Sequence, residues 1–364
     1  MKNYKFLLII SFFSFLFFSC GGTNSGSLDL VVVTTPTNLV INKVIVGSSA
    51  TMPNGDGTGV VNFSASANNA KEYKMSVDGE ILKSTTGSFT YTFKQSGTNN
   101  HTVYVFAYNG DKFISGSTIV TVYVIPKAVF FDEFNVDGAP DSSKWGYDLG
   151  NNNGWGNNEA QYYTNRTQNA VVSNGTLKIN LIKEAYQGYN YTSARLLSKG
   201  KYSMKYGKVE IRAKIPSGGG TWPALWMLGD NIDSVGWPAC GEIDIMEEVG
   251  YNANYVSSSI HCKAYNHSIG TQKTKEILLS TAQTEFHVYA LEWTEDYIKT
   301  FVDGKELFYF ANDKTGNKNT WPFNAPFYLK LNLAWGGNWG GAQGVDESVL
   351  PATYEIDYVR VFQK

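Results

Sequence analysis

The 364-residue sequence has little net charge, few histidines and cysteines, and few stretches with helical periodicity. A net charge of −2 provides no basic field for nucleic acid or an anionic membrane, and it makes a strongly anionic substrate less favourable. No His–Cys cluster with zinc-site spacing is present. The glycine-rich run at 54–59 lacks a following helix and lysine, so it predicts a turn and not a nucleotide loop. These absences argue against nucleic-acid, zinc and nucleotide chemistry.

Aromatic residues are abundant. They make up 15% of the chain, with 9 Trp and 23 Tyr. Two interpretations stay open for them as a group. Aromatic side chains pack well in β-sheet cores. Their flat rings also suit a cleft in which they lie against the apolar faces of sugar rings.

The N-terminal residues have the pattern of a targeting segment. Lys2 and Lys5 precede an apolar run over 6–18, which is too short to span a bilayer comfortably. The run ends in Phe-Ser-Cys-Gly-Gly at 18–22, which resembles a bacterial lipobox. We therefore expect a signal peptide at 1–19, a lipidated Cys20 and a flexible tether at 20–27. This anchors the chain outside the cytoplasm, at the outer membrane or cell surface; ordinary secretion with an incidental cysteine is the alternative.

Cys240 and Cys262 are the cysteines left in the mature chain. An oxidising compartment would permit a disulfide between them. Strand alternation argues against it, because Cys240 shares a side with Glu242, whereas Cys262 follows His261 and should point away from that side. We expect two free thiols.

Residues 28–126 have the rhythm of a small β-sandwich. Short alternating strands are separated by the turn signals Asp78-Gly79 and Asn109-Gly110, as in an immunoglobulin-like fold. The segments 87–93 and 102–107 resemble a PKD-type domain. A spacer role is the favoured interpretation, and glycan binding is the alternative. The expected strands cover 39–46, 60–65, 73–77, 88–93, 101–108 and 119–124.

Pro126-Lys127 marks the expected boundary of a second domain, over 127–364. This part is also rich in strand patterns, with Gly, Asn and Trp clusters between them. The whole chain is therefore predicted to be all-β. A sandwich of this size is ordinary for one domain, and a large two-sheet sandwich can bend to present a concave face to a polymer.

Three acids in the segment 241–248 carry the chemistry. Glu242 and Asp244 share a strand face because successive side chains alternate. Strict alternation would bury Glu247, which is costly for an unpaired carboxylate. A β-bulge at Ile245-Met246 would return Glu247 to the acidic face.

The expected separation of the two glutamates favours a retaining glycosidase. Four effective strand steps of ~3.3 Å place their Cα atoms roughly 13 Å apart, and the side chains reduce the carboxyl gap to about 5–6 Å. Retaining enzymes need ~5–5.5 Å, and inverting ones ~6.5–9.5 Å. We predict Glu242 as nucleophile, Glu247 as acid/base and Asp244 as the group that poises both.

The segment 235–247 resembles the active-site strand of glycoside hydrolase family 16, in its laminarinase-like branch. Segments 154–159, 162–164, 192–196, 219–229 and 355–361 resemble further family motifs in the same order. The resemblance covers about 129–364. It implies a β-jelly-roll with a concave cleft, retaining chemistry without a cofactor, and β-1,3-glucan as substrate.

The resemblance also implies substrate contacts, each with a structural alternative. Core packing is the alternative for the tryptophans, a salt bridge with a cleft acid for the arginine, and a structural role for the histidine. The implied substrate-binding residues are Asn158, Arg195, Trp222, Trp226, Trp237, His261 and Trp335. Within the late loop 335–339, Trp335 is the better candidate.

A structural calcium on the convex face is implied in the same way. Glu133, the backbone of Gly175 and Asp357 fall at matching positions, and oxygen ligands suit Ca²⁺. Surface acids without an ion are the alternative.

The function expected from these features is hydrolysis of β-1,3- or mixed β-1,3/1,4-glucan by a monomeric enzyme. Two alternatives stay open. One is a non-catalytic surface glycan-binding lipoprotein, against which both glutamates argue. The other is a galactan hydrolase acting on agar or porphyran, which the near-neutral charge makes less favourable.

Overall fold

The computed structural model describes residues 33–363 and divides the chain into two compact units, 1–124 and 125–364. The division falls beside the expected boundary at Pro126-Lys127. The predicted signal peptide, Cys20 and the tether lie outside the described residues. Within the described part, no helix is long and apolar enough to cross a membrane.

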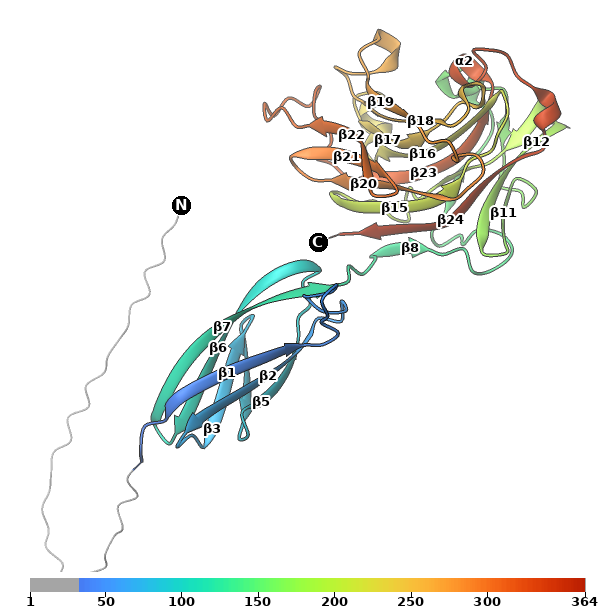
Figure 1. Ribbon diagram of the computed structural model, residues 1–364. Helices are drawn as coiled ribbons and strands as arrows, with labels where there is room; N and C mark the ends of the chain where they lie inside the picture. The colour runs from blue at the N-terminus through green and yellow to red at the C-terminus, as the bar shows by residue number, and fades with distance from the viewer. Residues whose placement is uncertain (1–32, 364) are drawn as a thin grey trace, which may run out of the picture. The chain divides into compact units, whose positions relative to one another are not determined.

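The first unit is a sandwich of two antiparallel sheets (Figure 1). The three-stranded sheet runs in the order β1 (Thr37–Ile45), β2 (Val60–Asn68) and β5 (Ser88–Thr92). The four-stranded sheet runs in the order β4 (Glu80–Ser84), β3 (Glu72–Val77), β6 (Gly97–Asn109) and β7 (Lys112–Val124).

Alternation of apolar and polar residues builds this sandwich. On β6, Val103, Val105 and Ala107 are fully buried, while the intervening side chains face outward. The Asn109–Lys112 turn joins β6 and β7 into a hairpin of two 13-residue strands. Strand β7 therefore starts earlier than its apolar pattern predicted, because pairing with β6 extends it through a serine-rich stretch. Strand β4 was not predicted.

The second unit consists of two stacked sheets, and this jelly roll confirms the predicted fold (Figure 1). The seven-stranded sheet runs β19 (Lys273–Leu278), β18 (Tyr255–His261), β17 (Glu242–Glu247), β16 (Thr221–Gly229), β23 (Phe327–Trp335), β14 (Arg195–Leu197) and β9 (Gly146–Asp148). The ten-stranded sheet runs β10 (Tyr162–Tyr163), β13 (Tyr189–Ser193), β12 (Thr176–Tyr186), β24 (Ala352–Phe362), β15 (Gly207–Lys214), β20 (His287–Trp293), β21 (Tyr297–Val302) and β22 (Lys305–Ala311), with β11 (Ala170–Ser173) on β12 and β8 (Phe130–Asp132) on β24.

The core lies between these two sheets. Strands β16, β17 and β23 point Leu225, Ile243 and Leu331 into it, all fully buried. Two short helices, α1 (Ile232–Val235) and α2 (Gly337–Gly340), lie in the connections after β16 and β23. The opposite face of the seven-stranded sheet carries acids and other polar residues together with aromatic side chains, and we call it the site face.

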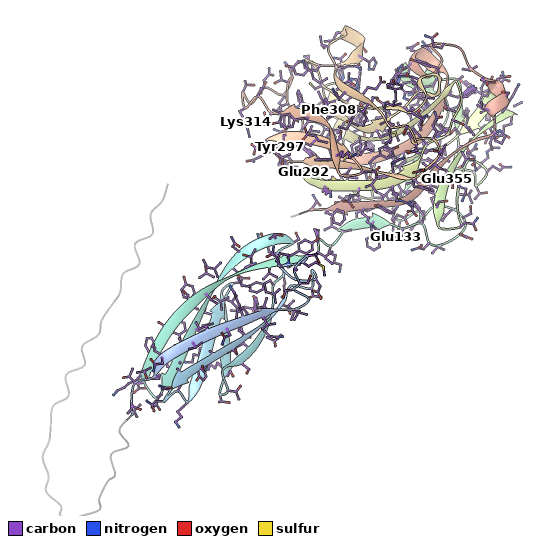
Figure 2. The ribbon with its side chains drawn as sticks, in the orientation of Figure 1. Glu133, Glu292, Tyr297, Phe308, Lys314 and Glu355 are labelled. Atoms are coloured by element: carbon purple, nitrogen blue, oxygen red, sulfur yellow. The ribbon has the colours of Figure 1, made fainter. Side chains whose placement is uncertain are left out.

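The outer face of the ten-stranded sheet carries ion pairs where a calcium site was expected. Both Glu133 oxygens accept hydrogen bonds of 2.7 Å from Arg360, and Asp357 pairs with Arg212 at 2.5 Å. Glu355 pairs with Lys214 at 2.7 Å on the same sheet; Glu133 and Glu355 are labelled in Figure 2. Two different arginines thus pair with the two expected side-chain ligands, and the calcium site stays a prediction.

Candidate active site

Strand β17 contains the predicted bulge. Asp244 pairs with Ser259 and Glu247 with Ser257, so three residues of β17 advance against two of β18. Ile245 and Met246 both lie in the core, fully buried. The extra residue between Asp244 and Glu247 therefore sets the three acids on the site face, which confirms this part of the sequence analysis.

Burial and the charge of Asp244 shift Glu242 and Glu247 toward their protonated forms. The Glu242 side chain is 17% exposed and that of Asp244 is 3% exposed. Burial, reinforced by the charge of Asp244, raises the pKa of Glu242 to about 7. The same two causes raise the pKa of Glu247 well above its ordinary value. The site thus contains two carboxyl groups whose protonated forms are favoured by burial and by the Asp244 charge.

His261 provides the positive charge of this cluster. It lies opposite Glu242 in the sheet register, with its Nε2 3.2 Å from Asp244 Oδ2 and 3.9 Å from Glu242 Oε1. Burial opposes its charged form, but the neighbouring Asp244, Glu242 and Glu247 outweigh that effect and raise its pKa to about 9. Although these side chains place ligand atoms within 4.8 Å, as a metal site would, an ion pair accounts for their convergence.

Two tryptophans donate hydrogen bonds to the catalytic candidates. Trp222 Nε1 donates to Glu247 Oε1 at 3.0 Å, and Trp237 Nε1 donates to Glu242 Oε2 at 3.0 Å. Trp222 is half-buried on the site face, whereas Trp237 is 37% exposed in the loop before β17. Each indole orients one glutamate and leaves its ring at the edge of the site.

Trp226 lies next to a buried lysine that the sequence analysis did not single out. The register places Trp226 between Asp244 and Lys330. Lys330 Nζ lies 4.4 Å from the centre of the indole ring and 2.8 Å from Asp148 Oδ2. Burial and the nearby Arg195 lower the pKa of Lys330 to about 8. The lysine therefore covers part of the ring that was expected to receive sugar.

Arg195 forms the salt bridge that stood as the alternative to substrate contact. It is 5% exposed and pairs with Glu159 at 3.2 Å and with Asp148 at 3.8 Å. Tyr163 links Glu159 to β23, since its hydroxyl donates a hydrogen bond to Glu159 and accepts one from Asn332. The alternative salt bridge is therefore present, with its hydrogen bonds made by Nη2, and the role of Arg195 as a donor to sugar stays a prediction.

The early loop that contains Asn158 is joined to the late loop after β23. Asn158 is exposed and its side-chain amide donates to Asn338 Oδ1 at 2.8 Å. Backbone pairing of Glu159 with Gly336 adds a second link. The two loops thus form one rim beside the site face, with Asn158 on its exposed side.

The prediction that Trp335 contacts the substrate is wrong, because its side chain is fully buried in the core. Alternation on β23 explains the error. Lys330 and Asn332 face the site, so Trp335 shares the inward parity of Leu331. Trp339 is the tryptophan of this loop that lies at the site, half-buried, with its ring 5.4 Å from that of Trp222.

Both cysteines in the described part of the chain are free and buried, as predicted. Cys240 packs with Leu228 and Tyr328 on the site side of the sheet, whereas Cys262 lies in the core between the sheets. The opposite directions predicted from strand parity are confirmed.

A family model for glycosyl hydrolases family 16 matches residues 157–360. The chain belongs to this family. A β-glucanase of Rhodothermus marinus is 51% identical over 242 residues, which cover 65% of this chain and 84% of the relative. The crystal structure of the laminarinase from Rhodothermus marinus is similar with a TM-score of 0.64 and 49% identity, over 65% of this chain and 97% of that one.

A second solved structure with a bound saccharide is also similar. It is a mutant of SCLam, a non-specific endo-β-1,3(4)-glucanase from family GH16, crystallised with 1,3-β-D-cellotriosyl-glucose. It has a TM-score of 0.64 and 47% identity, over 66% of this chain and 95% of that one. Family 16 membership accounts for the acid trio as a hydrolytic site that needs no cofactor.

The residues that sequence analysis missed are those whose roles depend on partners from distant strands. Lys330 of β23 meets Asp148 of β9, and Glu159 of the early loop meets Arg195 of β14. In both cases the partners are far apart in the sequence. One signal was available for Lys330. It lies two residues before Asn332 in a strand whose other residues are apolar or aromatic, so both polar side chains share one face.

Proposed function

We propose that this family 16 hydrolase is a retaining endo-β-1,3-glucanase that also cleaves mixed β-1,3/1,4-glucan. The observation that supports it is the trio of Glu242, Asp244 and Glu247 on one bulged strand, with His261 as the adjacent cation. The relatives named above support the choice of glucan. The near-neutral chain also suits an uncharged polymer.

Glu242 and Glu247 divide the two steps of a double displacement. The Glu242 carboxylate attacks the anomeric carbon while Glu247 transfers its proton to the departing glycosidic oxygen. A glycosyl ester on Glu242 results, and the aglycone leaves as an alcohol. Glu247, now ionised, removes a proton from water, whose oxygen attacks the anomeric carbon and releases Glu242. The product keeps the β-configuration.

Asp244 and His261 adjust the charge of both glutamates. The Asp244 charge raises the pKa of Glu247, which keeps the proton needed for the first step. His261 acts in the opposite direction on Glu242, so the nucleophile can ionise despite its burial. Trp237 supports the same ionised form through its hydrogen bond.

The decisive experiment measures reducing-sugar release from laminarin, lichenan, agarose and porphyran. We expect activity on laminarin and lichenan, with the β-anomer as the first product by proton NMR. Activity only on agarose or porphyran would support the galactan alternative. Binding of a glycan without turnover on any of the four would support the non-catalytic alternative, and initial release of the α-anomer would contradict the retaining assignment.

We also propose that the mature chain is a monomer held outside the cytoplasm, at the outer membrane or cell surface, by a lipid on Cys20. The lipobox-like sequence at 18–22 supports the lipid anchor. A Cys20→Ala variant should move from the membrane fraction to the soluble fraction. The structural calcium implied by the family resemblance is not part of this proposal, because arginines pair with Glu133 and Asp357.

A further inference from the structure

The outward face of the four-stranded sheet in the first unit carries a row of aromatic side chains. Tyr104, Phe106 and Tyr108 alternate along β6, and Phe113 lies beside Tyr108 on β7. Tyr104 and Phe113 are each 51% exposed. We call these four residues the aromatic ridge. Alternate residues of one strand face the same side, so the ridge extends roughly 13 Å from Tyr104 to Tyr108.

Three rings of the ridge, those of Phe106, Tyr108 and Phe113, are close enough to act as one surface. The Tyr108 and Phe113 ring centres are 5.3 Å apart, and those of Phe106 and Phe113 are 6.0 Å apart. The side chains flanking Tyr104 across the sheet are Ser76 and Ser117. Because serines are short, the Tyr104 ring rises above its neighbours, with hydroxyl groups on both sides.

The other sheet of the same sandwich shows that the fold does not require such a face. Its outward side carries Asn62, Ser64 and Thr90 on β2 and β5, beside the exposed Val40 and Val44 of β1. Both sheets supply apolar residues to the shared core. The aromatic residues are thus additional to what stability needs, and contiguous exposed apolar surface of this kind marks binding sites.

The charge of the ridge favours an uncharged ligand. Lys74 lies 4.3 Å from the Tyr108 ring centre and 3.9 Å from Glu72, so this ion pair is balanced, and Lys83 opposite Lys74 adds a single positive charge. Flat rings flanked by hydroxyl groups and a balanced ion pair match a sugar chain, which offers apolar ring faces and many hydroxyl groups but no charge. A nucleic acid or an anionic lipid surface would require an unbalanced basic patch.

We propose that the aromatic ridge is a binding site for an uncharged polysaccharide, namely the β-glucan that the catalytic unit hydrolyses. The identity of the glucan rests on the proposed function, whereas the sugar-binding character rests on the ridge itself. By binding insoluble polymer, the first unit raises the local concentration of substrate for the second. A soluble oligosaccharide needs no such help.

The test uses the full chain with Glu242→Gln, so that polymer is not degraded during the measurement. Partition onto insoluble β-1,3-glucan powder is compared between this protein and the same protein carrying Tyr104→Thr and Phe113→Thr. Threonine retains strand propensity. Loss of two half-exposed rings should weaken partition about tenfold or more. Val40→Thr with Val44→Thr is the matched control on the other sheet, and it should change nothing.

A second measurement separates this inference from the proposed function. With Glu242 intact, the ridge variant should hydrolyse soluble laminarin at the parental rate and insoluble glucan several-fold more slowly. Unchanged partition, or equal loss in the control variant, would overturn the inference. The inference would also be overturned if the ridge variant partitioned normally but lost concentration-dependent self-association, which would assign the ridge to a second copy of the chain. Normal partition with lost binding to neutral lipid vesicles would assign the ridge to a membrane instead. If no glucan is hydrolysed but partition still depends on the ridge, only the proposed function fails.

Discussion

The two sheets of the second unit carry carboxylates in opposite electrostatic settings. On the outer face of the ten-stranded sheet, Glu133 is held by Arg360, which lowers its pKa. On the site face, Glu242 and Glu247 are crowded by Asp244 and desolvated, which raises theirs. Carboxyl groups of the same type therefore form ion pairs on one sheet and are shifted toward protonation on the other, and the difference comes from their neighbours.

Removing one carboxylate from each sheet should give the largest difference in kcat between two variants. Glu242→Gln removes the nucleophile, and we expect kcat on laminarin to fall at least about 10³-fold. Glu355→Gln removes a salt bridge with Lys214 on the other sheet and should change kcat less than about twofold. Initial-rate kinetics measures both. Comparable losses in the two variants would mean that the site face has no special role.

Replacing His261, the cation of the site face, should shift the dependence of kcat/KM on pH. His261→Gln deletes the positive charge that lowers the pKa values of Glu242 and Glu247. Asp244 faces both glutamates, Lys330 also acts on Glu242, and Glu242 also acts on Glu247. We expect both limbs of kcat/KM against pH to shift upward by about one unit, and activity on the acid side to fall about tenfold.

His267→Gln is the matched control for this shift. The ring of His267 lies 5.2 Å from that of His261, and burial and His261 lower its pKa, which favours its neutral form. Its removal should leave the position of both limbs unchanged. An unmoved profile in His261→Gln would contradict the charge-balancing role.

A buried acid with no cationic partner should affect stability instead of rate. Glu248 is fully buried and accepts hydrogen bonds from Asn254 N and Gln283 Nε2, and burial raises its pKa to about 8. The folded state thus binds more protons than the unfolded state between pH ~4.5 and ~8, and stability falls as pH rises through that window. The fall in Tm between pH 5 and pH 9 should be about 3 °C smaller in Glu248→Gln than in the parental protein.

The exposed Glu285 provides the comparison for that measurement. Glu285→Gln should retain the parental dependence of Tm on pH. An equal change in both variants, or none in Glu248→Gln, would show that Glu248 is not the group responsible.

Chelation should have the smallest effect. Because Glu133 and Asp357 already have arginine partners, EDTA should change Tm by less than about 1 °C, and added Ca²⁺ should not raise it. Differential scanning calorimetry measures both. A fall of several degrees that Ca²⁺ reverses would show that the ion pairs on the outer face give way to a cation in solution.

Much of the active strand could be predicted because its cues are local. Alternation placed Glu242 and Asp244 on one face, and the cost of burying Glu247 required the bulge that the structure contains. Strand parity likewise gave the opposite directions of Cys240 and Cys262. Parity would also have placed Trp335 in the core, but the glycine-rich loop after it suggested proximity to ligand instead.

The sequence by itself determined the all-β class, the order of the two units, the three acids and their shared face, because these follow from a two-residue period and from residue type. Only the tertiary structure decided which charges meet. Arg195 joins Glu159, Lys330 covers Trp226, and arginines occupy the expected calcium ligands, through contacts between strands far apart in the chain. Such pairing depends on sheet order and register across several strands, and no local period encodes that order.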